Sequence, residues 1–140
     1  MTSNFKIRNF IEVEFDGQEF DLHNNFSFVT FSHDKQTDEL KIYFCKSNGD
    51  WVSKNEIDKL TFTLSKIHYL KTIDPKPELI ADDQCLSGIT FYYSNDRVEN
   101  TGLLDRQVPE AGDDIIFTFE NDRVIRVNCD TVMLKSEKFN

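Results

Sequence analysis

The side chains with the widest range of chemistry in this sequence are three histidines and three cysteines, and their spacing decides what they could do together. They are His23, His33, His68, Cys45, Cys85 and Cys129. No pair among them has the C-x2–4-C or H-x3–5-H separation that zinc sites commonly use. A metal site assembled from distant residues stays open on these grounds, but the spacing predicts neither a metal nor a cofactor.

The cysteines also lack the sequence surroundings of a nucleophile. A catalytic thiolate needs an adjacent base and a stabilising, usually cationic environment, and an acidic chain offers little of the second. Cys129 alternates with Val127 and Ile125, as a small buried hydrophobic residue would. Three cysteines without short spacings argue against a disulfide framework and favour a reducing compartment. We therefore expect structural cysteines in a cytoplasmic protein.

Paired carboxylates are the remaining candidates for acid–base chemistry. Glu12 and Glu14 form one pair, and Glu19 and Asp21 form a second. Residues two apart on a strand project from the same face, so either pair could act together. The apolar residues that alternate with Glu12 and Glu14 would occupy the core face, which leaves these glutamates in solvent. We predict no catalytic residues, since an enzyme would need a cleft joining a carboxylate to a histidine.

Several function classes are disfavoured by motifs that the sequence lacks. Its five glycines build neither a phosphate-binding loop nor a dinucleotide fingerprint, and no Gly-x-Ser-x-Gly nucleophile elbow occurs. Basic patches interleaved with aromatic residues are missing, which argues against nucleic-acid binding. No apolar run approaches the roughly 18 residues of a membrane span, and residues 1–12 have no apolar signal-peptide core. We expect neither a nucleic-acid nor a membrane partner.

The negative charge of the chain is concentrated between residues 74 and 122. This segment holds twelve acidic residues and three basic ones, a difference equal to the formal net charge of −9 of the whole chain. A one-sided acidic field repels nucleic acid and anionic membranes and favours a basic partner. We therefore predict a partner-binding surface on the loops of this segment, with five candidate residues: Asp82, Asp83, Glu110, Asp113 and Asp114.

Size, acidity and β-rich composition together favour a non-catalytic protein-binding module. In these three respects the chain resembles small acidic bacterial immunity or inhibitor proteins, which cover the basic active site of a toxin. The resemblance implies a basic protein partner and rests on no sequence motif. Complementary fields of this kind speed association and exclude wrong partners.

The phenylalanines suggest an alternative function. Phe accounts for 13 of the 140 residues, and an aromatic-rich sheet that curls can enclose an apolar pocket. Such a pocket would make the protein a carrier of a small apolar ligand. The candidate lining residues are Phe26, Phe28, Phe31, Phe91, Phe117 and Phe119. The opposing interpretation is that these rings pack against one another.

Period-two alternation identifies the elements that must position these residues. Asp16-Gly17 separates two alternating runs and predicts a type I′ hairpin. The best candidate for a helix is 53–59, which Ser53 and Glu56 could start as a capping box. Two prolines predict a connection over 74–77. Further strands are expected over 26–31, 39–46, 60–71, 79–81, 85–93 and 115–134. A shift in the alternation predicts a bulge near Ser65-Lys66.

These patterns predict the fold class. We expect a mainly β protein, either all-β or β-dominated α+β, with an antiparallel sheet and at most one short helix. The sheet could form a sandwich or a partly open barrel, because alternation identifies the buried face of a strand and not the order of strands. The 140 residues are expected to form a single domain over 1–140.

Overall fold

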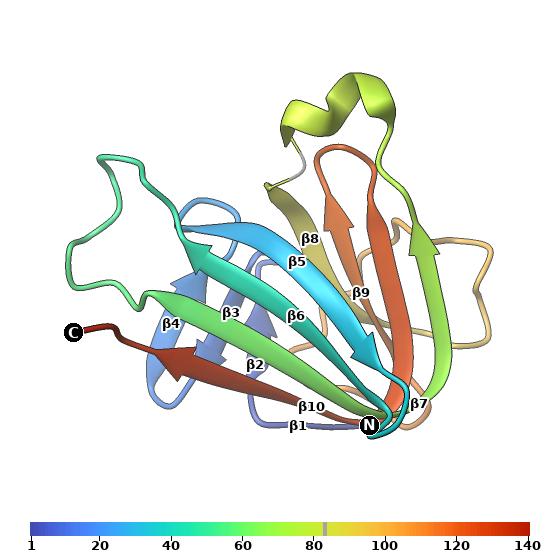
Figure 1. Cartoon of the computed structure of the whole chain (residues 1–140). Coiled ribbons are helices and arrows are strands. Elements are labelled where there is room, and N and C mark those ends of the chain that lie inside the picture. The colour runs from blue at the N-terminus through green and yellow to red at the C-terminus, as the bar shows by residue number, and fades with distance from the viewer. Residues whose placement is uncertain (83) are drawn as a thin grey trace.

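The computed structural model describes residues 1–82 and 84–140 and consists mainly of antiparallel strands (Figure 1). The strands are β1 (Thr2–Ser3), β2 (Lys6–Arg8), β3 (Glu12–Phe15), β4 (Gln18–Asp21), β5 (Phe26–Asp34), β6 (Glu39–Lys46), β7 (Lys59–Ile73), β8 (Leu86–Tyr92), β9 (Asp114–Phe119) and β10 (Val124–Glu137). The one helix in the described part is a 3-10 helix, η1 (Pro77–Asp82). The prediction of a mainly β protein is confirmed.

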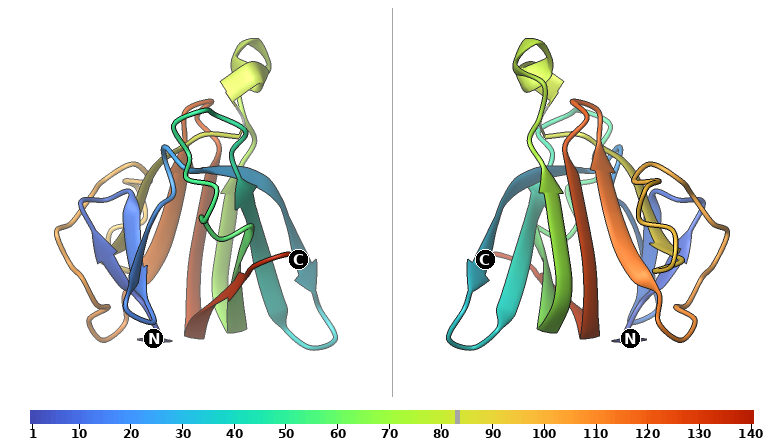
Figure 2. Two further views of the ribbon diagram at one scale, coloured as in Figure 1. Left: turned by 90° about the vertical axis from the view of Figure 1, so that its left-hand side faces the viewer. Right: turned by 90° about the vertical axis from the view of Figure 1, so that its right-hand side faces the viewer.

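The larger sheet forms a half-barrel. Its strands follow the order β5-β6-β7-β10-β9-β8, and β1 pairs with β10 in parallel. The two longest strands, β7 and β10, pair with each other along almost their whole length. Two side views show how the strands arch around a concave face (Figure 2). Of the architectures that the sequence left open, the partly open barrel is therefore the correct one.

The smaller sheet has the order β2-β3-β4 and packs on the concave side of the larger one. Its β3–β4 hairpin turns at Asp16 and Gly17, whose φ angles are 53° and 76°. Positive φ at both positions is the type I′ geometry that the Asp-Gly pair predicts. Ile7, Val13 and Phe20 of this sheet are buried in the same hydrophobic cluster as residues of the larger sheet.

Phenylalanine rings fill the space between the two sheets. The ring of Phe5 meets that of Phe62 edge-on at a centroid distance of 5.3 Å, and Phe62 meets Phe117 in the same way at 5.3 Å. Phe28 and Phe119, which come from opposite parts of the larger sheet, lie 4.8 Å apart. Large apolar rings in such edge-to-face contacts close a core without burying polar groups.

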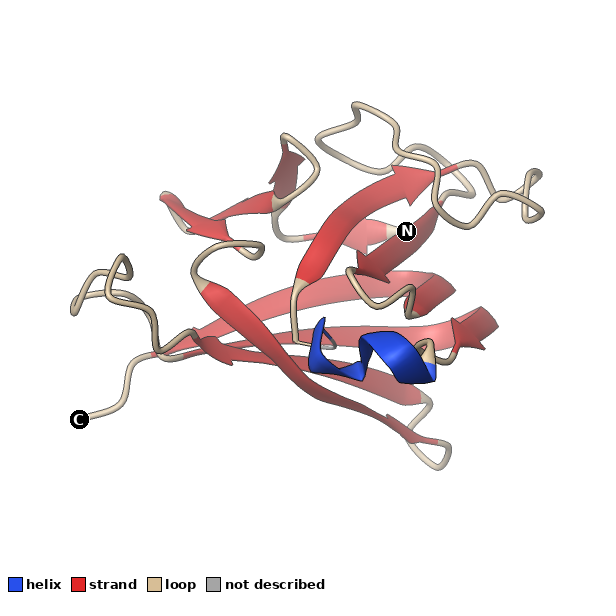
Figure 3. Cartoon of the chain, turned by 90° about the horizontal axis from the view of Figure 1, so that it is seen from above, coloured by secondary structure: helices blue, strands red, loops and turns tan. Residues whose placement is uncertain are grey.

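The two edge strands of the half-barrel approach each other at one end. There the backbone N–H of Phe28 on β5 donates to the carbonyl of Gln84, just before β8, at 2.8 Å. The N–H of Glu120, in the β9–β10 turn, donates to the carbonyl of Cys85 at 2.9 Å. The view from above shows the strands around this end with η1 beside them (Figure 3). We call this junction the seam.

The predicted helix over 53–59 is wrong, because that segment forms turns instead. The Ser53 hydroxyl accepts from the N–H of Asn55 at 3.1 Å, but the Glu56 carboxylate accepts from the next residue, Ile57, and does not complete a capping box. The expected strand over 79–81 is also wrong, since these residues belong to η1. No helix among the described residues has the length and apolar content that crossing a membrane requires.

The predicted bulge in β7 is confirmed, close to the expected place. The pairing of β7 with β10 shifts by one residue between Asn128 and Cys129, opposite Ile67 and Tyr69. Lys66, next to this shift, has a φ of 58°. The extra residue, His68, has no partner in the register, and such a bulge increases the local twist of the sheet.

Candidate functional site

Two of the five predicted partner-binding residues are not on the surface. Asp113 is 3% exposed and Asp114 is fully buried. Each is paired with an arginine, Asp113 with Arg106 and Asp114 with Arg126. An arginine next to a buried carboxylate offsets part of the cost of burying either charge alone. The expectation that both carboxylates face a partner is corrected: they hold the acidic segment together from inside.

Asp114 is the centre of a buried ion-pair network. Its Oδ2 accepts from Nε of the fully buried Arg126 at 2.7 Å, and Arg97 donates to both carboxylate oxygens at 3.0 Å. Asn128 adds a fourth bond, to Oδ1 at 2.9 Å. Burial alone would raise the pKa of Asp114, but the bonds from Arg97, Arg126 and Asn128 outweigh it and hold this pKa below its usual value.

The same network fixes the loop that follows β8. Arg126 donates from its remaining nitrogens to the backbone carbonyls of Tyr93 at 2.8 Å, Asp96 at 3.0 Å and Glu99. Arg97, within this loop, also stacks over the ring of Tyr69 with its guanidinium carbon 3.8 Å from the centroid. A loop without regular structure is therefore anchored to β10 at several points.

Asp113 and Glu110 share one arginine. Arg106 donates to both oxygens of Asp113 at 2.6 and 2.7 Å, and its other terminal nitrogen lies 3.2 Å from the carboxylate of Glu110. The Glu110 side chain is 69% exposed, so this predicted residue does lie on the surface. Asp83 and the side chain of Asp82 lie outside the described residues.

Most other carboxylates of the acidic segment are exposed. Lys76, its one lysine, is paired with Asp122 at 2.8 Å, and both of its arginines are paired with buried aspartates. Apart from Glu120, which lies 3.8 Å from His23, five exposed carboxylates of the segment have no ion pair with lysine or arginine within residues 1–82 and 84–140: Asp74, Glu78, Asp96, Glu99 and Asp105. These are the residues that carry the outward negative charge.

An open cleft of about 510 Å³ is lined by Glu99, one of these carboxylates. Val98 and Leu103, which are 94% and 43% exposed, line it together with Glu99. Asp122 and Arg123 of the β9–β10 turn also line it. The cleft thus combines an apolar wall with carboxylates, between the anchored loop and the turn.

The six phenylalanines of the predicted ligand pocket are packing residues. Phe26, Phe28, Phe91, Phe117 and Phe119 are 0–4% exposed, and Phe31 is half-buried against the same core. Their rings contact one another and the neighbouring phenylalanines, as Phe28 and Phe119 do. Within the described part of the chain they do not together line a cleft, and the interpretation that the rings pack together accounts for them.

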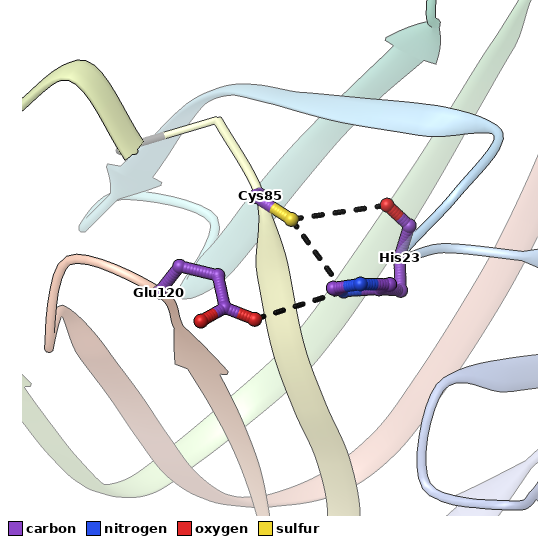
Figure 4. A group of neighbouring side chains, drawn as sticks. All are labelled: His23, Cys85 and Glu120. Carbon is purple, nitrogen blue, oxygen red and sulfur yellow. Dashed lines mark hydrogen bonds and ion pairs between the residues drawn. The ribbon is translucent and has the colours of Figure 1, made fainter.

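The structure does bring one histidine, one cysteine and one carboxylate together, at the seam (Figure 4). Nδ1 of His23 lies 3.4 Å from Sγ of Cys85 and 3.8 Å from Oε1 of Glu120. All three potential ligand atoms lie within 4.8 Å of one another. His23 follows β4, Cys85 precedes β8 and Glu120 follows β9, so three separate connections supply the group.

Local hydrogen bonds hold these side chains in place. The Asp21 carboxylate accepts from the N–H of His23 at 3.0 Å and of Asn24 at 2.9 Å, which fixes the turn after β4. Nδ1 of His23 also lies 2.6 Å from the carbonyl oxygen of Leu86. Because a carbonyl only accepts, this nitrogen carries the proton in the structure described.

The remaining histidines and cysteines lie apart from this group. His68 pairs with Asp130 at 2.6 Å on the sheet surface, and His33 lies 3.5 Å from Asp38 near the β5–β6 turn. Cys129 is buried, as predicted, and burial raises its pKa to about 12. Sequence spacing gave no signal for the seam group, whose three members are 62 and 35 residues apart.

A scan of protein-family models, a search of curated proteins and a search of solved structures each find no match.

Proposed function

We propose that this protein is a non-catalytic binding module that captures a basic protein partner on its acidic segment. The observation that carries the proposal is the uncompensated charge of Asp74, Glu78, Asp96, Glu99 and Asp105. The arginines of this segment are bound to buried aspartates, and among the described residues the exposed carboxylate that they also contact is that of Glu110. Exposed charges of one sign, on the anchored loop and around η1, attract and orient a partner of the opposite sign.

The cleft beside this surface suits a basic side chain of the partner. Lysine and arginine have an aliphatic stem and a charged end, so they match an apolar wall next to a carboxylate. Val98 and Leu103 provide that wall, and Glu99 provides the carboxylate; Asp122 also lines the cleft but is paired with Lys76. Arg123 also lines the cleft and lies over Phe28, with its guanidinium carbon 5.4 Å from the ring centroid.

The size, acidity and β-rich fold support a role like that of small immunity or inhibitor proteins. We place the protein in the cytoplasm, an assignment supported by three cysteines of which none is in a disulfide. A carrier of apolar ligands is a weaker candidate, because the phenylalanines proposed to line its pocket are occupied in packing.

The test compares two variants that change the net charge equally. The test variant carries Asp74→Asn, Glu78→Gln and Asp105→Asn, all exposed in the acidic segment. The matched control carries Asp16→Asn, Glu19→Gln and Asp50→Asn, all exposed outside it. Binding of a fluorescent ten-residue lysine peptide is measured by anisotropy at low and moderate salt.

We expect the test variant to bind about tenfold more weakly than the native protein at low salt. Each exposed charge pair contributes about 0.2–1 kcal/mol, so three of them give a change of this order, which added salt reduces. The control variant should stay within about twofold to threefold of the native protein. Equal losses in the two variants would show a general charge effect and would overturn the proposal.

A further inference from the structure

The seam combines three side chains that are common metal ligands, contributed by three connections that no sequence motif links. We propose that Cys85, His23 and Glu120 form a binding site for one divalent transition-metal ion of the zinc type. This site is separate from the acidic docking function and is tested without it.

The distances suit such an ion. Zinc lies about 2.3 Å from a thiolate sulfur, 2.0–2.1 Å from an imidazole nitrogen and 2.0–2.2 Å from a carboxylate oxygen, so tetrahedral ligand atoms are about 3.4–3.6 Å apart. Here Sγ of Cys85 and Nδ1 of His23 are 3.4 Å apart, and Nδ1 and Oε1 of Glu120 are 3.8 Å apart. Side-chain adjustments on the order of 1 Å close the group around one ion.

The arrangement favours metal binding over a cysteine nucleophile. In a catalytic triad the nucleophile and the carboxylate contact different nitrogens of the imidazole, so that the carboxylate orients the ring while the other nitrogen moves the proton. At the seam both Cys85 and Glu120 approach the same nitrogen, Nδ1 of His23. Three groups that converge on one point are placed to share an ion.

Metal binding at Nδ1 replaces an existing interaction. In the structure described, this nitrogen donates its proton to the Leu86 carbonyl at 2.6 Å. A bound ion takes the place of that proton and also requires Cys85 as the thiolate. The hydrogen bond keeps the ring facing the other two ligands until the ion replaces it.

The site is open to solvent and its ligand set is selective. The side chains of His23 and Glu120 are 34% and 44% exposed, and a cleft of about 300 Å³ is lined by His23, Cys85 and Trp51. An ion can enter by this route, and a water molecule can complete four ligands. Sulfur and nitrogen ligands favour zinc and cobalt over magnesium and calcium, which prefer oxygen.

The experiment titrates the full chain, freed of metal by a chelator, with zinc chloride by calorimetry and with cobalt chloride by absorption. We expect one ion per chain and a thiolate-to-cobalt charge-transfer band. Cys85→Ser should remove the band, and His23→Gln and Glu120→Gln should each weaken zinc binding by at least about tenfold, since even groups that only orient a ligand contribute this much. The matched controls are Cys45→Ser, His68→Gln and Glu78→Gln, which should bind as the native protein does.

A second measurement uses the native protein and does not depend on how a variant folds. Bound zinc should slow the alkylation of Cys85 by iodoacetamide at least about tenfold, while Cys45 reacts at the same rate with and without zinc. The proposal is overturned by a native protein without the cobalt band, by a Cys85→Ser variant that retains it, or by zinc that leaves Cys85 alkylation unchanged.

Discussion

The buried network around Asp114 predicts a large effect of one isosteric substitution. Asp114→Asn keeps the shape of the side chain but removes its charge, while Arg126 remains fully buried beside it. The carboxylate accepts four hydrogen bonds, and the amide nitrogen of asparagine cannot accept those directed at it. Removing one partner of a buried ion pair costs about 3–5 kcal/mol. We expect this loss in the free energy of unfolding, measured by urea denaturation.

The control for this prediction is Asp105→Asn, an exposed carboxylate of the same acidic segment. It should change the free energy of unfolding by less than about 0.5 kcal/mol. A double variant, Asp114→Asn with Arg126→Met, should lose less than the sum of the two single losses, because the two residues stabilise each other. A loss below about 1 kcal/mol for Asp114→Asn would refute the argument that this pair holds the loop after β8 in place.

Three further predictions follow from the structure. Hydrogen bonds outweigh burial and hold the pKa of Asp114 below its usual 3.8. The stability that Asp114 contributes is therefore full above that pH and is lost as the pH falls through the lower folded pKa. Acid unfolding of Asp114→Asn should lack this component, and an unchanged pH profile would contradict this prediction. The pKa of Cys129 is raised from 9.0 to about 12, which implies about a thousandfold less thiolate at pH 8. Iodoacetamide should therefore leave Cys129 of the folded protein unmodified when peptides are analysed by mass spectrometry. Prompt modification would disprove this prediction. Gly17→Ala should lower the free energy of unfolding by about 1–2 kcal/mol in urea, since φ is 76° at that position, and a neutral effect would argue against the type I′ turn.

The sequence predicted the elements whose local signals agree with the tertiary structure. Asp16-Gly17 formed the expected hairpin because a type I′ turn needs positive φ at both central residues, and this pair adopts it. The segment after Ser53 did not form a helix, because one turn of capping residues gains little without an apolar face to bury. Ile57 is the one apolar residue that such a helix would have offered the core.

The burial of Asp113 and Asp114 was missed because the acidic residues were assigned to solvated loops. One signal was present: Arg126 interrupts an apolar run on β10, between Ile125 and Val127. A cation inside a buried strand requires a buried anion, and Asp114 at the start of the paired strand provides it. The seam group of His23, Cys85 and Glu120 had no such signal, because only strand order brings its connections together.

Mapping where a basic ligand binds is the most direct way to establish whether the acidic segment is a docking surface. Nuclear magnetic resonance of the isotope-labelled chain, titrated with the ten-residue lysine peptide, reports each backbone amide separately. We expect the largest shifts at Val98, Glu99 and Asp122 of the cleft and at the exposed carboxylates Asp74 and Glu78. Shifts of equal size on the acidic residues of the β3–β4 and β5–β6 hairpins, or no shifts beside the cleft, would contradict it.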